Sequence, residues 1–206
     1  MDSWIGTYTK EQVFPLTPDP STVHLEDIAH ALSNICRFNG HTNGHYSVAQ
    51  HCLNVANLCA KLAESMNLSE YDSSLAELEG LMHDASEYAL CDVPSPIKQF
   101  FSINGESYYA VEERLQRAIR VGLGFDRYIP EEVKGIVKHA DLAMLRIEAD
   151  RLMHGTGWWN WEVPEATVEF SYSVKPTNTE DSRNLVKHNF KTRFNVLSRR
   201  LASMEE

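Results

Sequence analysis

Apolar residues recur at helical spacing along most of this chain, and that periodicity constrains the fold more than any other feature. Side chains three and four positions apart share one face of a helix, so each apolar stripe predicts a helix that buries that face. The stripes predict helices over about 24–36, 48–66, 69–89, 106–121 and 130–153, and from residue 181 onward. We therefore expect an all-α helical bundle.

Two parts of the chain lack this periodicity. The first 22 residues contain Pro15, Pro18 and Pro20, which indicates an irregular lead-in or short strands. After residue 155 the stretch "ATVEFSYSV" alternates and predicts a short strand or extended edge. The neighbouring Trp158, Trp159 and Trp161 are expected in the core or an interface, with a lid over a cleft as the alternative. We expect only minor extended segments in these two regions.

The length of 206 residues suits one domain with a sizeable core. We expect a single domain over 1–206, with a motif-bearing core at about 24–153 and a C-terminal extension at about 154–206.

The sequence contains no run of about 18 apolar residues, so no membrane span is expected. The start "MDSWIGTYTKEQVF" lacks the basic and apolar regions of a secretory signal. A cytoplasmic protein is therefore expected.

The formal net charge of −10 restricts the partners. An acidic surface repels a polyanion, so duplex nucleic acid is a poor candidate. A small phosphorylated substrate remains compatible, because a metal and a few local cations can reverse the field inside one cleft.

The stretch "GLMHDASEYALCDVPSPIKQF", residues 80–100, concentrates chemistry in a helix that runs into a Pro turn. It contains His83, Asp84, Glu87, Asp92 and Lys98. Four residues able to bind metal, or phosphate through metal, are followed by a cation. The stretch is either a catalytic centre or an unusually polar helix end.

Two further residues extend this set. His51 and Asp141 lie near the buried sides of two other predicted helices, as His83 and Asp84 do on theirs. Side chains from facing helices build metal sites in bundle cores. Two imidazoles and two carboxylates suit a divalent ion such as Mn, Fe, Co, Ni or Zn. Such an ion activates water and polarises a phosphoryl oxygen.

The order His, His-Asp, Asp on three helices resembles the HD-domain metal-dependent phosphohydrolases. "RFNGHTNGHYSVAQH", "LMHDASEYALCDVPSPIK" and "VKHADLAML" are similar to the branch with the 5'-deoxynucleotidases and the phage deoxyadenosine triphosphohydrolases that make 2-aminoadenine genomes possible. The resemblance covers about residues 24–153 and implies an HD-type bundle with a divalent metal in its core.

The resemblance also implies roles for individual residues. The implied metal ligands are His51, His83, Asp84 and Asp141. Glu87 and Asp92 would position water, act in catalysis or hold additional ions, such as Mg, under the phosphates. Substrate binding is implied at Arg37, Phe38, Lys98 and Lys138. Members of this branch often carry Trp after the arginine, and here Phe38 stands in its place. The resemblance therefore does not assign the residues that contact the nucleotide base.

The activity expected first is hydrolysis of a deoxynucleoside monophosphate to deoxynucleoside and phosphate. A triphosphohydrolase that converts dATP to deoxyadenosine and triphosphate is the alternative, because the acids after His-Asp and the two lysines suit a longer phosphate chain. A non-catalytic nucleotide or metal sensor is the second alternative. We also expect a homo-oligomer. Base preference and metal identity stay open.

Overall fold

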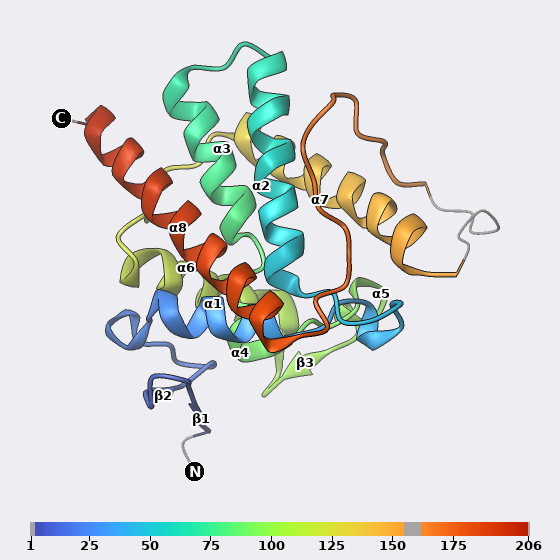
Figure 1. The fold of residues 1–206 in the computed structure, drawn as a ribbon. Coiled ribbons are helices and arrows are strands. Elements are labelled where there is room, and N and C mark those ends of the chain that lie inside the picture. Colours follow the sequence, from blue (N-terminus) through green and yellow to red (C-terminus); the bar gives the residue numbers. More distant parts are fainter. Residues whose placement is uncertain (1–2, 155–161, 206) are drawn as a thin grey trace.

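The computed structural model describes residues 3–154 and 162–205, and helices dominate these residues (Figure 1). The longer helices are α1 (Leu25–Asn34), α2 (Val48–Ser65), α3 (Glu70–Met82), α6 (Tyr108–Gly122), α7 (Glu131–Leu152) and α8 (Glu180–Glu205). The short ones are α4 (Glu87–Leu90), α5 (Ser95–Lys98) and the 3-10 turns η1 (Pro20–Thr22) and η2 (Phe38–Gly40). The all-α prediction is confirmed. None of the described helices is long and apolar enough to cross a membrane.

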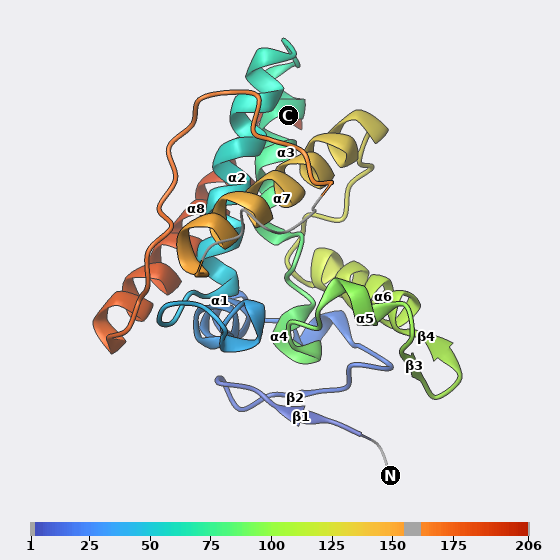
Figure 2. The same ribbon diagram turned by 90° about the vertical axis from the view of Figure 1, so that its right-hand side faces the viewer.

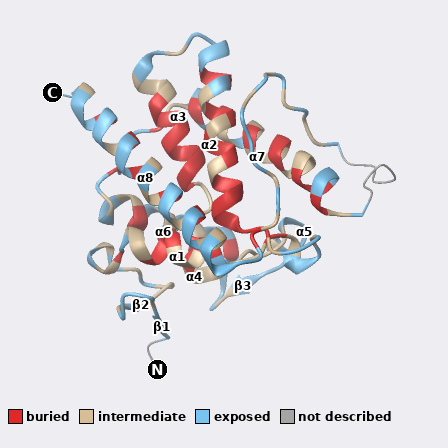
Figure 3. Ribbon diagram, in the orientation of Figure 1, coloured by how far each residue is buried: buried red, intermediate tan, exposed pale blue. Residues whose placement is uncertain are grey.

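Helices α2 and α3 form the centre of the bundle. α7 packs on them from one side and α8 from the other, with α1 beneath α8 (Figures 1 and 2). Buried residues concentrate on α2 and α3 (Figure 3). A Cβ at Gly80 would lie 2.7 Å from the Cys59 sulfur, so α3 approaches α2 as closely as only glycine permits. This contact brings the end of α3 against the middle of the bundle.

Ser47 precedes Gln50 by three residues, a sequence pattern that predicts a capping box, and the structure confirms this box at the start of α2. Ser47 Oγ accepts a hydrogen bond from the backbone N–H of Gln50 at 3.3 Å, and Gln50 Oε1 accepts one from the N–H of Ser47 at 3.0 Å. The two bonds satisfy backbone donors that a helix start otherwise leaves unpaired. His51 follows on the first turn and is fully buried.

The third predicted helix is not continuous to residue 89. α3 ends at Met82, and the chain turns through 83–86 before α4 begins. In a continuous helix the N–H of Ser86 would donate to the carbonyl of Met82. Here Gln116 of α6 bridges the two groups: its Nε2 donates to Met82 O at 2.6 Å, and its Oε1 accepts from Ser86 N at 3.1 Å. A side chain from another helix therefore stabilises the break.

The strand expected at 166–174 does not form. The segment is irregular, and side chains of α2 hold its backbone. Asn57 donates to the carbonyl of Ser171 at 3.0 Å, and Asn54 pairs with both polar backbone groups of Ser173 at 2.9 and 3.1 Å. A strand needs a neighbouring strand, and here the neighbour is a helix. Trp158, Trp159 and Trp161 lie outside the described residues.

Two small hairpins complete the described part. β1 (Ile5–Gly6) pairs antiparallel with β2 (Gln12–Val13), which agrees with the short strands expected in the first 22 residues. β3 (Ser102–Ile103) pairs with β4 (Glu106–Ser107), so α6 begins two residues later than expected.

Candidate active site

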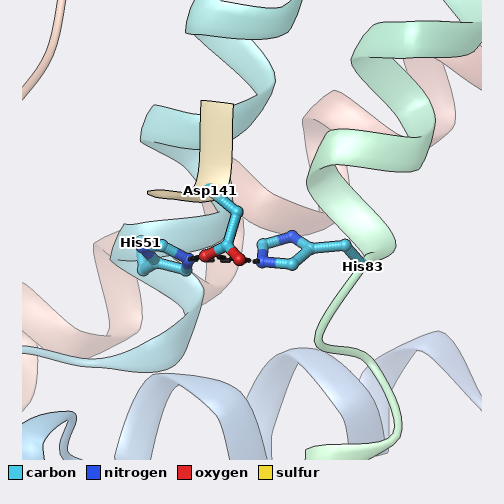
Figure 4. Close-up of side chains that lie close together, drawn as sticks. All are labelled: His51, His83 and Asp141. Atoms are coloured by element: carbon cyan, nitrogen blue, oxygen red, sulfur yellow. Dashed lines mark hydrogen bonds and ion pairs between the residues drawn. The ribbon is translucent and has the colours of Figure 1, made fainter. Parts of the chain in front are cut away.

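Three helices bring His51, His83 and Asp141 together (Figure 4). His51 lies on the first turn of α2, His83 follows the last residue of α3, and Asp141 lies in the middle of α7. The two Nε2 atoms are 3.2 Å apart, and Oδ1 of Asp141 lies 3.2 Å from His51 Nε2 and 3.8 Å from His83 Nε2. The helical faces read from the sequence thus meet at one point.

Asp84 joins the same cluster from the turn after α3. Its Oδ2 lies 3.1 Å from His83 Nε2 and 3.7 Å from His51 Nε2. Two imidazole nitrogens and two carboxylate oxygens therefore face one small volume. All four residues predicted as metal ligands contribute one of these atoms.

The donor set fits a divalent metal. Ligand atoms at about 2.1 Å from one ion lie about 3.0 Å apart at right angles and about 3.4 Å apart at a tetrahedral angle. The separations in the cluster run from 3.1 to 3.8 Å. Two imidazoles with two carboxylates are a set that borderline divalent metals accept. Cys52 is a further neighbour, because its sulfur lies within 4.8 Å of ligand atoms of His83 and Asp84.

Hydrogen bonds on the far side of each imidazole orient the two rings. His51 Nδ1 lies 2.8 Å from Oε1 of Glu148, and His83 Nδ1 lies 2.8 Å from the carbonyl oxygen of Gly80. Both partners only accept hydrogen bonds when Glu148 is ionised, so each Nδ1 carries the proton. Each Nε2 is then free to act as a ligand.

The charges of the cluster perturb the two aspartates. Burial raises the pKa of Asp84, but the neighbouring His83, His51 and Arg37 outweigh that effect and hold the pKa well below its usual range. In the metal-free chain the pKa values of His51 and His83 are raised, so each ring also carries a proton on Nε2; the hydrogen bond from His51 and the charge of His83 then outweigh burial at Asp141 and lower its pKa to about 2. Both carboxylates are therefore ionised at neutral pH.

Glu87 behaves in the opposite way. Its side chain at the start of α4 is buried, and Oε2 has no hydrogen-bond partner among the described residues. Burial and the charges of Asp84 and Asp92 raise the pKa of Glu87 to about 10. A buried carboxylate oxygen without a partner is costly, so this atom marks a place where a polar group binds. Asp92 lies in the loop before α5, and burial is the main cause that raises its pKa.

Lys98 lies on the Glu87 side of the site. Its Nζ contacts Oε1 of Glu112 at 2.9 Å and Oε1 of Glu87 at 3.9 Å. Burial lowers the pKa of Lys98, but the hydrogen bond to Glu112 and the nearby acids outweigh it and raise the pKa above its usual value. Lys98 is thus a fixed cation next to Glu87, held by a residue of α6.

Arg37 is a second buried cation beside the cluster. Nη1 lies 3.5 Å from Oδ2 of Asp84, and Nε donates to Oε2 of Glu148 at 3.1 Å. Phe38 follows with a positive φ of 54° and with its ring centre 5.6 Å from the guanidinium carbon. A bulky residue in the left-handed region is rare and strained, so the backbone of the turn after Arg37 is strained at Phe38.

A cavity of about 530 Å³ opens beside His83 and Asp141. Its basic lining residues include Arg117 of α6 and Lys134 and Lys138 of α7, while Glu79, Glu113 and Asp126 are acidic. Lys138 Nζ lies 3.9 Å from Oδ2 of Asp141. The structure thus places the predicted substrate-binding residues on two sides: Lys138 lines this cavity, whereas Arg37, Phe38 and Lys98 do not.

Sequence reasoning missed Glu148, Gln116, Glu112 and the basic residues Arg117 and Lys134. Glu148 had a detectable signal: it follows Asp141 by two helical turns and lies between Met144 and Leu152 on the apolar stripe. A carboxylate at such a position needs a buried partner. The other four lie on exposed or half-buried faces, where no periodicity marks them.

Comparison with known proteins agrees with this geometry. A His-Asp dipeptide meeting a second His and a second Asp in a helical bundle is the arrangement of HD-type metal-dependent phosphohydrolases. Residues 24–149 match the family described as 5'-deoxynucleotidase YfbR-like. The chain belongs to this family.

Three relatives illustrate its range. An uncharacterised protein of Rhodobacter capsulatus is 34% identical over 152 residues, 73% of each chain. The uncharacterised protein YfdR of Escherichia coli K12 is 35% identical over 146 residues, 71% of this chain and 70% of its own. A 5'-deoxynucleotidase of Citrobacter koseri is 31% identical over 109 residues, 46% of this chain and 55% of its own. These matches support a nucleotide phosphohydrolase that uses a divalent metal.

Proposed function

We propose that this chain hydrolyses deoxynucleoside 5'-monophosphates to deoxynucleosides and inorganic phosphate. One observation carries the proposal: the unpartnered, buried Oε2 of Glu87 belongs to the residue that directly follows the turn with His83 and Asp84. A metal-binding cluster with a free carboxylate beside it is what hydrolysis of a phosphate ester requires. The name of the relative from Citrobacter koseri agrees with this reaction.

We assign the metal to His51, His83, Asp84 and Asp141, whose ligand atoms face one another at 3.1 to 3.8 Å. Mn, Fe, Co, Ni and Zn all suit this set, and additional Mg would accompany the phosphates. When bound, the ion supplies Lewis acidity toward a phosphoryl oxygen and toward water.

Glu87 is the proposed general base, because a bound cation would lower its pKa, which burial and the neighbouring acids raise in the metal-free chain, and so leave the carboxylate ionised. Its Oε2 accepts a hydrogen bond from the attacking water and takes one proton as the water oxygen bonds to phosphorus. The bond between phosphorus and the 5' oxygen breaks, and the 5' oxygen takes a proton from the acid form of Asp92 and leaves as the deoxynucleoside; the proton held by Glu87 then restores Asp92 through solvent. Lys98, 3.9 Å from Oε1 of Glu87, stabilises the ionised carboxylate. Asp92 supplies a second acid from the neighbouring loop.

Arg37 and Phe38 are the proposed contacts of the substrate on the Asp84 side. Arg37 places a permanent positive charge 3.5 Å from Asp84, where it attracts the phosphate oxygens. Phe38 offers an apolar ring for the base in the place where relatives often carry Trp.

The cavity favours the triphosphohydrolase as a second candidate. Arg117, Lys134 and Lys138 line it next to His83 and Asp141, and although Glu79, Glu113 and Asp126 also line it, these three cations offer contacts for phosphates beyond the one that reacts. Arg117 has no hydrogen bond or ion pair to any other described residue, which leaves its guanidinium free for an anion. With dATP as substrate the products would be deoxyadenosine and triphosphate.

A panel of all deoxynucleoside mono- and triphosphates with Co²⁺ or Mn²⁺ tests both candidates, with phosphate and triphosphate followed separately. Phosphate release from monophosphates supports the first reaction, and triphosphate release from triphosphates supports the second. Turnover of no nucleotide by metal-loaded protein would contradict both and favour a sensor.

A further inference from the structure

Glu148 is the most completely buried acid near the site, and it makes three hydrogen bonds. The side chain lies in α7 with no exposed surface. Oε1 contacts Nδ1 of His51 at 2.8 Å and accepts from the hydroxyl of Tyr46 at 2.9 Å, while Oε2 accepts from Nε of Arg37 at 3.1 Å. One carboxylate thus touches both a proposed metal ligand and a proposed phosphate contact.

We propose that Glu148 is a positioning residue that holds His51 and Arg37 in their working orientations, so that metal binding and phosphate binding depend on one carboxylate. The inference rests on the proposed function, because it takes His51 as a ligand and Arg37 as a substrate contact. Neither the family match nor the names of the relatives assign a role to this residue.

The His51 contact decides which ring nitrogen faces the metal. A neutral imidazole has one bare nitrogen, and a proton on Nδ1 leaves the bare one at Nε2. Nε2 lies 3.2 Å from Asp141 Oδ1 and 3.2 Å from His83 Nε2, so the bare nitrogen points into the ligand cluster. A carboxylate behind a ligand histidine also makes the imidazole a better donor, and removing such partners weakens metal binding or activity by about 10 to 100-fold.

The Arg37 contact fixes the guanidinium over the same centre. Only 8% of Arg37 is exposed, and Nε uses Oε2 of Glu148 while Nη1 lies 3.5 Å from Oδ2 of Asp84. Among the described residues, the ion pairs of Arg37 are those with Glu148, through Nε, and with Asp84, through Nη1. Without the carboxylate, Arg37 would be buried with one ion pair fewer and a less defined position.

A role in stability alone makes a different prediction. Tyr46 adds a third bond to the network, and losing a buried acid destabilises most proteins. The matched control is Glu77, a buried glutamate of α3 that pairs with Arg193 of α8 and contacts no proposed ligand. If Glu148 only stabilises the fold, Glu148→Gln and Glu77→Gln should behave alike.

The test is calorimetric titration of the metal-free full-length chain with Co²⁺ in the absence of nucleotide. We expect Glu148→Gln to bind Co²⁺ about 10 to 100-fold more weakly than the unsubstituted protein, and Glu77→Gln to match it. In turnover with saturating Co²⁺, Glu148→Gln should also raise KM for dAMP, because Arg37 is less well held. Equal Co²⁺ affinity in Glu148→Gln and the unsubstituted protein would overturn the inference.

A second pair of variants keeps the test decisive if Glu148→Gln does not fold. Arg37→Met and the double variant Arg37→Met/Glu148→Gln differ only at Glu148, and the double variant leaves no unpaired arginine in the site. Weaker Co²⁺ binding in the double variant supports the inference, and equal binding overturns it. Because these titrations contain no nucleotide, an unsubstituted protein that binds Co²⁺ but hydrolyses no nucleotide would contradict the proposed function and leave the role of Glu148 intact.

Discussion

The Nε2 atoms of His51 and His83 lie 3.2 Å apart, although the two residues are 32 positions apart in the chain. Two bare nitrogens at that distance repel unless a cation or a shared proton lies between them. We expect His83→Ala to lose the metal and the activity, and chelation to lower the melting temperature of the unsubstituted protein by mass action. Metal content by mass spectrometry and thermal melts measure both effects. His188→Ala, at an exposed histidine of α8, is the control and should keep its metal. Full metal content in His83→Ala would contradict the assignment.

Glu87→Gln should keep the metal and reduce kcat by about 100-fold or more, because the amide cannot take a proton from water. The amide retains the shape of the side chain, so KM should change less than kcat. Steady-state kinetics on dAMP together with metal analysis separate the two effects. Turnover near that of the unsubstituted protein would leave Glu87 with a structural role.

The same residue should make the stability of the metal-free protein depend on pH. Burial and the charges of Asp84 and Asp92 raise the pKa of Glu87 from 4.5 to about 10. The folded protein therefore keeps a proton that the unfolded chain releases, and stability falls as pH rises between these two values. Glu87→Gln lacks this loss. As pH rises, the free energy of unfolding of the variant should therefore increase relative to that of the unsubstituted protein, by up to about 1.4 kcal/mol per pH unit. Urea unfolding with chelator at several pH values measures it, and a difference that is independent of pH would refute the prediction.

Lys138→Ala and Arg117→Ala should distinguish the two candidate substrates, because both side chains line the cavity beside Asp141. A charge-assisted contact contributes about 1.5 to 3 kcal/mol, so each loss should reduce kcat/KM for dATP by roughly 10 to 150-fold where the contact is made. Lys98→Ala should impair dAMP and dATP alike, since Lys98 acts next to Glu87. Lys61→Ala, at an exposed lysine of α2, is the control. Equal losses on both nucleotides in the cavity variants would rule out the triphosphate reading.

Gln116→Leu should destabilise the turn that carries Asp84. It leaves the N–H of Ser86 without its partner, which costs about 1 to 3 kcal/mol for an unsatisfied buried group, while the carbonyl of Met82 keeps its hydrogen bond from the N–H of Ala85. We expect a lower free energy of unfolding and a lower kcat, because Glu87 follows directly after this turn. Gln99→Leu, at an exposed residue whose side chain donates to the carbonyl of Pro96, should change neither quantity. Unfolding curves in urea measure the first effect, and wild-type stability in Gln116→Leu would show that the bridge is dispensable.

The sequence by itself determined the helices and the faces they bury, because helical periodicity and capping act within a few residues. It placed the capping box of Ser47 and Gln50 correctly, and it put His51, His83, Asp84 and Asp141 on inward-facing positions. Their assignment as metal ligands, like the roles of Glu87, Asp92, Arg37 and Phe38, remains a prediction.

Only the tertiary structure decided where these patterns stop and what surrounds them. The end of α3 depends on Gln116, which lies 30 residues beyond Ser86, and the segment around Ser173 depends on Asn54 of α2 rather than on a strand. The partners of His51 and Arg37 meet at Glu148, 97 and 111 residues away. Such contacts leave little trace in local spacing, because a side chain that bonds to a distant element needs only the right position in space, and that position is set by how the helices pack.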